Sequence, residues 1–280
     1  MGPADVSMGG LFAPPTGPTV DTLLSVEVED PKPGETLETL RAARLVILSR
    51  DTSGRFELQH RLPLPEKSSK LTVTFAILPN GNALCGVLGF TRAYELECSA
   101  ANSAGASFTL KAHQLPSAYH CVCGFRVCNE WRLAVAFQDG SVRAFALNGG
   151  AFSEVCQLPP LSTVRCYEIL AVRPGALCFR SASQNPDNSW TSFVDYVELD
   201  PLGHFLNPRR LLEYKGNLIL PTALPFAAAP HSRVALVATD FATRCVRFYE
   251  LIEWLLTENK FSIWLDKVWN FRIFVSPKCL

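Results

Sequence analysis

Histidine and cysteine, two of the residue types that bind zinc, gather in one short stretch of the chain. His120, Cys121 and Cys123 stand close together, and Cys128 follows them. Two thiolates and an imidazole suit zinc, but the stretch has no second C-x-x-C pair, which the usual zinc spacings require. Cysteine also serves as a small buried hydrophobe in strands. We therefore predict no metal site here, and no cofactor.

Three aspartates lie beside predicted hairpins, and paired carboxylates are the catalytic groups of glycoside hydrolases. They are Asp139, Asp195 and Asp240. Polar residues at turns are the ordinary explanation of this placement. The chain has no G-x-x-x-x-G-K, G-x-G-x-x-G, G-x-S-x-G or H-E-x-x-H motif. We predict no catalytic residue and no covalent catalysis. Four scattered histidines are expected at the surface: His60, His113, His204 and His231.

The elements that carry these residues repeat along the chain. Short hydrophobic runs that end in leucine recur at intervals of 48, 51, 52 and 52 residues: 45–48, 93–96, 144–147, 196–199 and 248–251. Strand-like runs rich in β-branched and aromatic residues precede them, separated by turn signals such as Asp139-Gly140. This period, with about four short strands per unit, is typical of a WD-repeat-like β-propeller. We predict an all-β propeller of about five blades over residues 21–251, with each leucine-ended run closing its blade.

Two segments inside this pattern need separate interpretation. The polar stretch 181–188 is predicted to be a loop between strands at 176–179 and 193–196. Residues 23–28 alternate in the manner of a strand, which we expect to close the ring beside the last blade.

Arginine recurs four residues before three of the closing leucines. These residues are Arg92, Arg143 and Arg247, and Asp195 fills the slot of the remaining aligned unit. A guanidinium group suits the carboxylates of a protein partner, so the three arginines are candidates for a partner-binding rim. Solvated strand ends are the alternative, and we favour it.

Both ends differ in composition from the repeats. Residues 1–20 hold four Pro and four Gly without an apolar run, which predicts a disordered lead. Residues 252–280 contain three of the five tryptophans and no Gly or Ala, and their structure stays open. A strand or helix packed on the last blade is favoured. Peripheral contact with a membrane through this aromatic tail is the alternative.

Charge and cysteine content narrow the class of partner. The 26 basic and 26 acidic residues cancel, so no general attraction to nucleic acid or to an anionic membrane is expected. The chain contains no run of 18 uncharged apolar residues, so we predict no transmembrane helix in it. Ten cysteines, several of them inside predicted strands, favour a reducing, cytoplasmic compartment. Protein partners are expected.

The succession of irregularities within the blades suggests a family. It runs from Leu110 to Pro116, through Cys121-x-x-x-Phe125 and Asp139-Gly140-x-Val142-Arg143, to Arg165-Cys166 and His204-Phe205-Leu206. This succession resembles the cytosolic propeller of the guanine-nucleotide exchange factors that begin coat-protein-II budding at the endoplasmic reticulum, the prolactin regulatory element-binding protein family. The resemblance covers about residues 44–251. The family has seven blades and a glycine-rich loop in its first blade, whereas residues 25–43 here hold only Gly34.

The resemblance implies exchange activity on a small GTPase in endoplasmic-reticulum-to-Golgi vesicle budding, on the cytosolic face of that membrane. Exchange requires a complementary surface and no covalent chemistry. A WD-repeat interaction scaffold in a cytoplasmic or nuclear complex, without exchange activity, is the alternative. The first would bind a nucleotide-free GTPase through the face near the first blade, and the second would hold stable partners.

Overall fold

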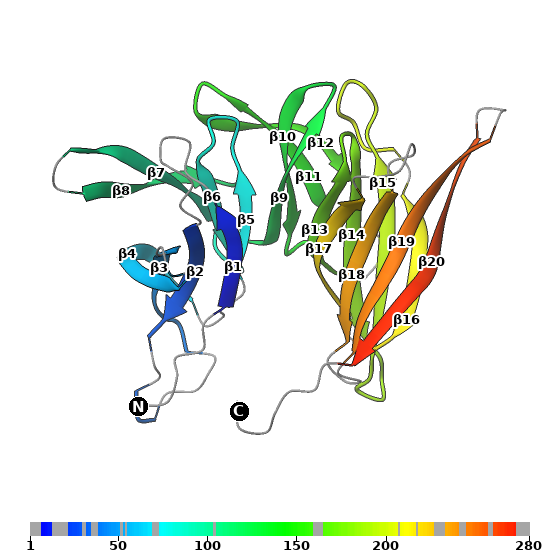
Figure 1. The fold of residues 1–280 in the computed structure, drawn as a ribbon, viewed down its shortest axis with the longest axis horizontal. Helices are drawn as coiled ribbons and strands as arrows, with labels where there is room; N and C mark the ends of the chain where they lie inside the picture. Colours follow the sequence, from blue (N-terminus) through cyan, green and yellow to red (C-terminus); the bar gives the residue numbers. More distant parts are fainter. Residues whose placement is uncertain are drawn as a thin grey trace. The chain divides into compact units, whose positions relative to one another are not determined.

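The structure is a computed structural model. It describes residues 7–12, 22–29, 32–34, 39–50, 53, 55–68, 73–102, 105–158, 165–206, 208–216, 218–226, 233–240, 245–256 and 260–272. Within these ranges the chain forms strands and no helix, and the strands make five four-stranded sheets (Figure 1). None of the described segments is a helix that is long and apolar enough to cross a membrane.

Each sheet is built from four strands that follow one another in sequence. The first sheet has β1 (Ser7–Phe12), β2 (Thr22–Val28), β3 (Arg41–Arg50) and β4 (Phe56–Ser68). The second has β5 (Val73–Ile77), β6 (Ala83–Val87), β7 (Arg92–Asn102) and β8 (Gly105–Gln114). The third has β9 (Tyr119–Val127), β10 (Glu130–Phe137), β11 (Val142–Asn148) and β12 (Ala151–Leu158).

The last two sheets repeat this plan. The fourth has β13 (Arg165–Arg173), β14 (Ala176–Gln184), β15 (Trp190–Glu198) and β16 (Arg209–Lys215). The fifth has β17 (Leu218–Phe226), β18 (Arg233–Asp240), β19 (Cys245–Leu256) and β20 (Lys260–Arg272). Strand pairing is antiparallel in the first, second, fourth and fifth sheets. Sequential four-stranded sheets of this kind are propeller blades, so the predicted all-β, five-bladed fold is confirmed.

The leucine period marks the third strand of every sheet. The five runs fall on β3, β7, β11, β15 and β19, with Leu199 directly after β15. They do not close their blades as predicted, because a fourth strand follows each of them. The fourth strands are outer strands with one neighbour in the sheet, so they are less buried. In β12 and β16, nearly every residue is exposed or half-buried.

Both ends of the chain contribute strands. Strand β1 lies inside the segment predicted to be a disordered lead, and it pairs with β2. Residues 23–28 belong to β2, which pairs with β1 and β3 inside the first sheet, and this pairing replaces the predicted place beside the last blade. In the tail, β20 pairs with β19 along its length. Part of the aromatic-rich segment is therefore a strand of the last sheet, which is one of the two structures that the sequence favoured for it.

The hairpin of the fourth sheet is tighter than predicted. Strand β14 continues through Ser181 to Gln184, so the connection to β15 is a short turn over Asn185–Ser189 in place of the long loop. The amide of Asn185 donates to the carbonyl of Ser189 at 2.8 Å and closes this turn. Strand pairing satisfies backbone groups that a loop would leave to water.

The chain divides into two compact units, and the third sheet contributes residues to both. The first unit contains residues 1–124, 131–138 and 145–154, and the second contains 125–130, 139–144 and 155–280. The core of the first unit collects buried apolar side chains from the first three sheets, among them Leu45, Leu84, Tyr94, Tyr119 and Phe137. In the second unit, Ala176 to Phe179 of β14 are fully buried.

One buried tyrosine joins two sheets of the first unit. The Tyr119 hydroxyl, on β9, donates to the carbonyl of Arg92 at 2.8 Å and accepts from the amide of Val87 at 3.2 Å. The ring lies so close to Gly86 that an added Cβ would be 3.1 Å from one of its carbons. Glycine at position 86 therefore leaves the space that this tyrosine occupies.

Candidate functional site

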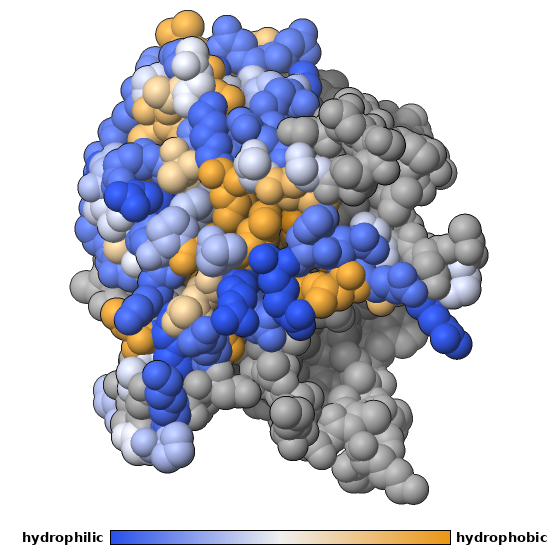
Figure 2. Space-filling view, turned by 90° about the vertical axis from the view of Figure 1, so that its left-hand side faces the viewer, coloured by the Kyte–Doolittle hydropathy of each residue, from blue (hydrophilic) through white to orange (hydrophobic). Residues whose placement is uncertain are grey.

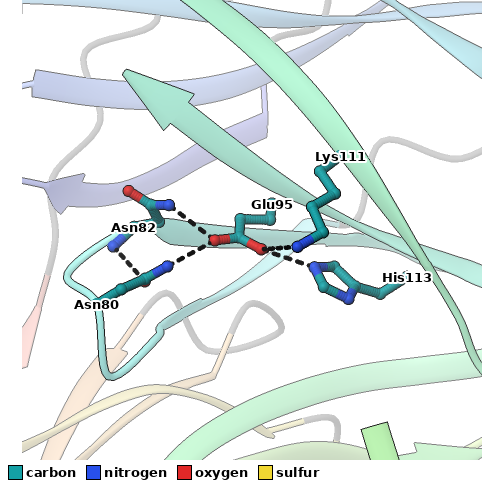
Figure 3. Close-up of polar contacts among 5 residues, drawn as sticks. All are labelled: Asn80, Asn82, Glu95, Lys111 and His113. Atoms are coloured by element: carbon teal, nitrogen blue, oxygen red, sulfur yellow. Dashed lines mark hydrogen bonds and ion pairs between the residues drawn. The ribbon is translucent and has the colours of Figure 1, made fainter. Parts of the chain in front are cut away.

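A cluster of polar side chains surrounds Glu95 in the first unit (Figure 3). One carboxylate oxygen of Glu95 accepts hydrogen bonds from the side-chain amides of Asn80 and Asn82, at 2.8 and 2.7 Å. The other oxygen lies 2.8 Å from Nε2 of His113 and 3.9 Å from Nζ of Lys111. Glu95 is 3% exposed and His113 is 5% exposed, so a charged carboxylate lies in the interior.

Three elements position this cluster. Glu95 stands on β7, and His113 and Lys111 stand on the neighbouring β8, where Glu95 is directly opposite Lys111. The two asparagines come from the turn between β5 and β6. Gly81 adopts a φ of 84° in that turn, and the amide of Asn82 donates to Oδ1 of Asn80 at 3.0 Å. The turn therefore aims both amides at the strand beside it.

The hydrogen bonds keep Glu95 ionised although it is buried. Burial by itself raises the pKa of this carboxyl, but the hydrogen bonds from Asn82, Asn80 and His113 outweigh it, and the pKa is lowered from the ordinary value of 4.5. A carboxylate beside an imidazole is able to act as an acid–base pair. Here the carboxylate has its donors inside the protein, and the arrangement ties a turn and an outer strand to β7.

Sequence reasoning missed this cluster. His113 was expected at the surface, whereas it is buried against Glu95 and against the ring of Phe152, with ring centroids 5.0 Å apart. His204 is exposed, as expected, and pairs with Asp200. His60 is half-buried, and His231 lies outside the described residues.

The predicted rim arginines have local partners. Nε of Arg92 donates to Oε1 of Gln114 at 3.2 Å, and the side chain of Arg92 is exposed. Arg143 lies 3.0 Å from Oδ2 of Asp139 and also donates to the Ser141 hydroxyl. Arg247 lies on β19, but its side chain is outside the part of the structure that is described. Arg92 belongs to the first unit and Arg143 to the second, so the partner-binding rim stays a prediction.

Of the three aspartates beside hairpins, the two whose side chains are described each interact with other groups. Asp139 holds its turn, because one carboxylate oxygen accepts from the amide and the hydroxyl of Ser141 at 2.8 and 2.6 Å. These bonds and Arg143 outweigh burial and lower the pKa of Asp139. Asp195 is buried and pairs with Arg210. The side chain of Asp240 is outside the described residues.

The cysteine-rich stretch lies on β9 and the turn after it. Cys121 is buried, Cys123 is half-buried, and Cys128 is exposed in the β9–β10 turn, where Cys128 and Asn129 have φ values of 46° and 70°. Within the part of the chain that the structure describes, no group of three or more His, Cys, Asp or Glu side chains is arranged to hold a metal ion.

Among the described residues, four of the six exposed large apolar side chains belong to the first unit. Phe56 and Leu58 on β4 are 41% and 44% exposed, and Ile77 and Leu40 are exposed as well. The face of the molecule that bears β4 and β8 shows apolar surface framed by hydrophilic residues (Figure 2). Apolar surface of this kind is typical of sites that bind other proteins.

Comparison with known proteins supports the fold and nothing narrower. No protein-family model matches the chain, and no curated protein sequence matches it. A putative 6-phosphogluconolactonase from Bacteroides fragilis is similar in structure, with a TM-score of 0.52 and 11% identity over 90% of this chain and 81% of that chain. Sqt1 from Chaetomium thermophilum has a TM-score of 0.49 and 14% identity over 88% of this chain and 69% of that chain. The first likeness agrees with a β-propeller.

Proposed function

We propose that the chain is a protein-binding propeller that acts on a small GTPase through its first blade. The observation that carries the proposal is the exposed apolar pair Phe56 and Leu58 on β4. The two residues are two positions apart on one strand, so they point to the same face of the sheet. Leu58 lies opposite the half-buried Leu48 of β3, which extends the apolar area across the strand pair.

The finer function that we propose is guanine-nucleotide exchange in vesicle budding at the endoplasmic reticulum, on the cytosolic side. Its support is the resemblance of the blades over about residues 44–251 to exchange factors of that pathway. An exchange factor works by binding the nucleotide-free GTPase more tightly than the loaded form, so it needs an apolar and shape-matched surface. A first-blade surface with exposed Phe56 and Leu58 suits that task.

A scaffold role is the second candidate, because the same apolar surface suits any stable protein partner. The two functions differ in one measurable respect. An exchange factor accelerates nucleotide release, whereas a scaffold retains its partners and leaves the release rate unchanged. Peripheral contact of the tail with a membrane belongs to the exchange-factor proposal, since it would hold the propeller near its GTPase.

The test measures release of a fluorescent GDP analogue from the secretory small GTPase of the same organism, with and without the chain. We expect acceleration by the wild type and a loss of about tenfold or more for Leu58→Glu, because a charge in the centre of an apolar contact disrupts it. Leu202→Glu is the matched control, since Leu202 is 71% exposed in the other unit. Equal rates with and without folded chain would exclude exchange, and capture of partners that depends on Leu58 would then support the scaffold.

The rim arginines enter the same assay. Arg92→Glu and Arg143→Glu reverse the charge at two of the three candidate positions. If a rim binds the carboxylates of the partner, each reversal slows association, and the loss shrinks at high salt. An unchanged rate for both variants would assign these arginines to the solvated strand ends.

A further inference from the structure

Asparagine is a thermolabile residue, and it loses ammonia most readily before glycine, which has no side chain to shield its backbone nitrogen. The chain holds two such pairs, Asn80-Gly81 and Asn148-Gly149. In the first pair, the side-chain amide is bonded to the buried carboxylate of Glu95. We propose that Asn80 is a site of spontaneous modification, and that its conversion to an acidic residue permanently weakens the second sheet. The inference goes beyond the proposed function and does not depend on it.

The reaction consumes a water molecule and releases ammonia. The backbone nitrogen of Gly81 gives up its proton and attacks Cγ of Asn80, and the new bond between them closes a cyclic imide. Nδ2 takes up a proton and leaves as ammonia. Water then opens the ring at either of its carbonyl carbons. One opening gives aspartate, and the other gives isoaspartate, in which the chain runs through the former side chain.

The native turn between β5 and β6 holds both groups that the reaction must release. The N–H of Gly81 donates to the carbonyl of Leu78 at 2.9 Å, which retains the proton that the attacking nitrogen has to lose. Nδ2 of Asn80 donates to Glu95 at 2.8 Å, which retains the leaving nitrogen (Figure 3). Oδ1 of Asn80 accepts from the amide of Asn82 at 3.0 Å, so the side chain is anchored at both ends. Modification therefore requires the turn to open first.

The second Asn-Gly pair is a control that the chain itself supplies. Nδ2 of Asn148 donates to the hydroxyl of Ser153 at 2.9 Å, and both residues are exposed. Water competes for a hydrogen bond at such a position, so this bond restrains the reaction less. A carboxylate formed at position 148 would face a hydroxyl that is able to donate to it. Both pairs belong to the first unit.

At Asn80 the product cannot replace the group that it removes. The side-chain amides of Asn80 and Asn82 both donate to the same oxygen of Glu95. A carboxylate at position 80 has no hydrogen to donate near neutral pH, and it adds a second negative charge beside that of Glu95. Because the ammonia diffuses away, closing the turn does not restore the amide. A chain that has reacted therefore keeps a weaker turn, and its second sheet opens more readily.

The first test compares the two pairs in one sample. The full chain is kept in a mildly alkaline buffer with and without urea, and its peptides are followed by mass spectrometry, with chromatography to separate aspartyl from isoaspartyl forms. In urea we expect the two pairs to react at similar rates. In the native chain we expect the rate at Asn80 to fall at least about tenfold below its rate in urea, and the rate at Asn148 to change less than about threefold.

The second test measures what the product does to the fold. Asn80→Asp introduces the aspartate product directly and should lower the midpoint of thermal unfolding by roughly 4 °C or more. Asn148→Asp is the matched control and should change the midpoint by about 1 °C or less. In the Glu95→Gln background, Asn80→Asp should cost about half as much or less, because the neutral amide at position 95 donates to the new carboxylate.

Three results would overturn the proposal. The first is a rate at Asn80 that is equal in the native chain and in urea, or no reaction in either. The second is an unchanged unfolding midpoint in Asn80→Asp. The third is an equal loss with and without Glu95→Gln, which would separate the effect from the buried carboxylate. If Asn80→Asp alone does not fold, folding of the double variant supports the proposal, and its failure to fold counts as the third result.

Discussion

Nε2 of His113 lies 2.8 Å from a carboxylate oxygen of Glu95, and the two side chains come from neighbouring strands of the second sheet. Glu95 also receives the side-chain amides of Asn80 and Asn82. A single buried carboxylate thereby connects the β5–β6 turn, the third strand and the outer strand of one blade. Its contribution is structural, and it is measurable as stability.

Removal of this carboxylate should destabilise the fold. Glu95→Ala removes the acceptor of the buried His113 imidazole and of the side-chain amides of exposed Asn80 and half-buried Asn82. We expect a loss of about 2–3 kcal/mol in the free energy of unfolding. Glu95→Gln keeps the shape and should cost less, about 1–2 kcal/mol. Urea denaturation followed by circular dichroism measures both. Glu57→Gln, at an exposed position of β4, is the control, with an expected change within about 0.5 kcal/mol.

Acid should weaken the fold through the same group. The pKa values of Glu95 and Asp139 are lowered from the ordinary values of 4.5 and 3.8. The unfolded chain therefore takes up protons more readily, so the stability from these groups is present above their ordinary values and is lost as pH falls through the lowered ones. At pH values below about 4.5, we expect the urea concentration at the unfolding midpoint to decrease as the pH is lowered. This decrease should be less steep in the Glu95→Gln variant. A midpoint that rises on acidification would contradict this sign.

Arg210 should matter more than its exposure suggests. Its guanidinium lies 4.3 Å from the centre of the Phe193 ring and donates to both oxygens of Asp195, and the Asp195 side chain is 5% exposed. Arg210→Ala leaves that buried carboxylate without its cation, so we expect a loss of about 1–3 kcal/mol. The stability of Arg210→Lys should lie between those of the wild type and Arg210→Ala, because the lysine ammonium keeps the charge but lacks the planar guanidinium that binds both carboxylate oxygens. Arg126→Ala, at an exposed position of the same unit, should change little.

Thiol reactivity should separate the cysteines by position. Burial raises the pKa of Cys85 and of Cys178 to about 12, so neither forms thiolate near neutral pH. Cys128 is exposed in its turn. A brief treatment of the native chain with iodoacetamide, read by mass spectrometry of peptides, should label Cys128 and leave Cys85 and Cys178 intact until urea is added. Early labelling of either buried cysteine would mean that its sheet opens under native conditions.

The sequence alone predicts the blade number and misplaces the blade boundary. The third strands β3, β7, β11 and β15 contain buried residues, and each of the five third-strand runs ends in leucine, so a hydrophobic period marks them. The outer strands β8, β12 and β16 face solvent on part of their surface, and residues such as Lys111, Glu154 and Glu213 weaken the strand pattern there. Strand β1 lies in a segment rich in Gly and Pro, where composition indicates disorder.

The polar cluster at Glu95 lies beyond the reach of pattern analysis. Glu95 and His113 are brought together by the pairing of Ala93 with His113 and of Glu95 with Lys111. That register depends on the turn and on packing of the whole blade, and a shift of one residue would reverse the faces. The available signal was modest: Asn80 and Asn82 flank Gly81 just before a glutamate-bearing strand.

The hydroxyl of Tyr119 connects two neighbouring blades by hydrogen bonds. Because it holds the amide of Val87 and the carbonyl of Arg92 at once, β6 and β7 cannot separate from β9 without breaking both bonds. The second and third blades are thereby coupled, and hydrogen–deuterium exchange at Val87 becomes a reporter of their joint opening. A substitution that destabilises one of these blades should therefore also increase the amide exchange rates of the other.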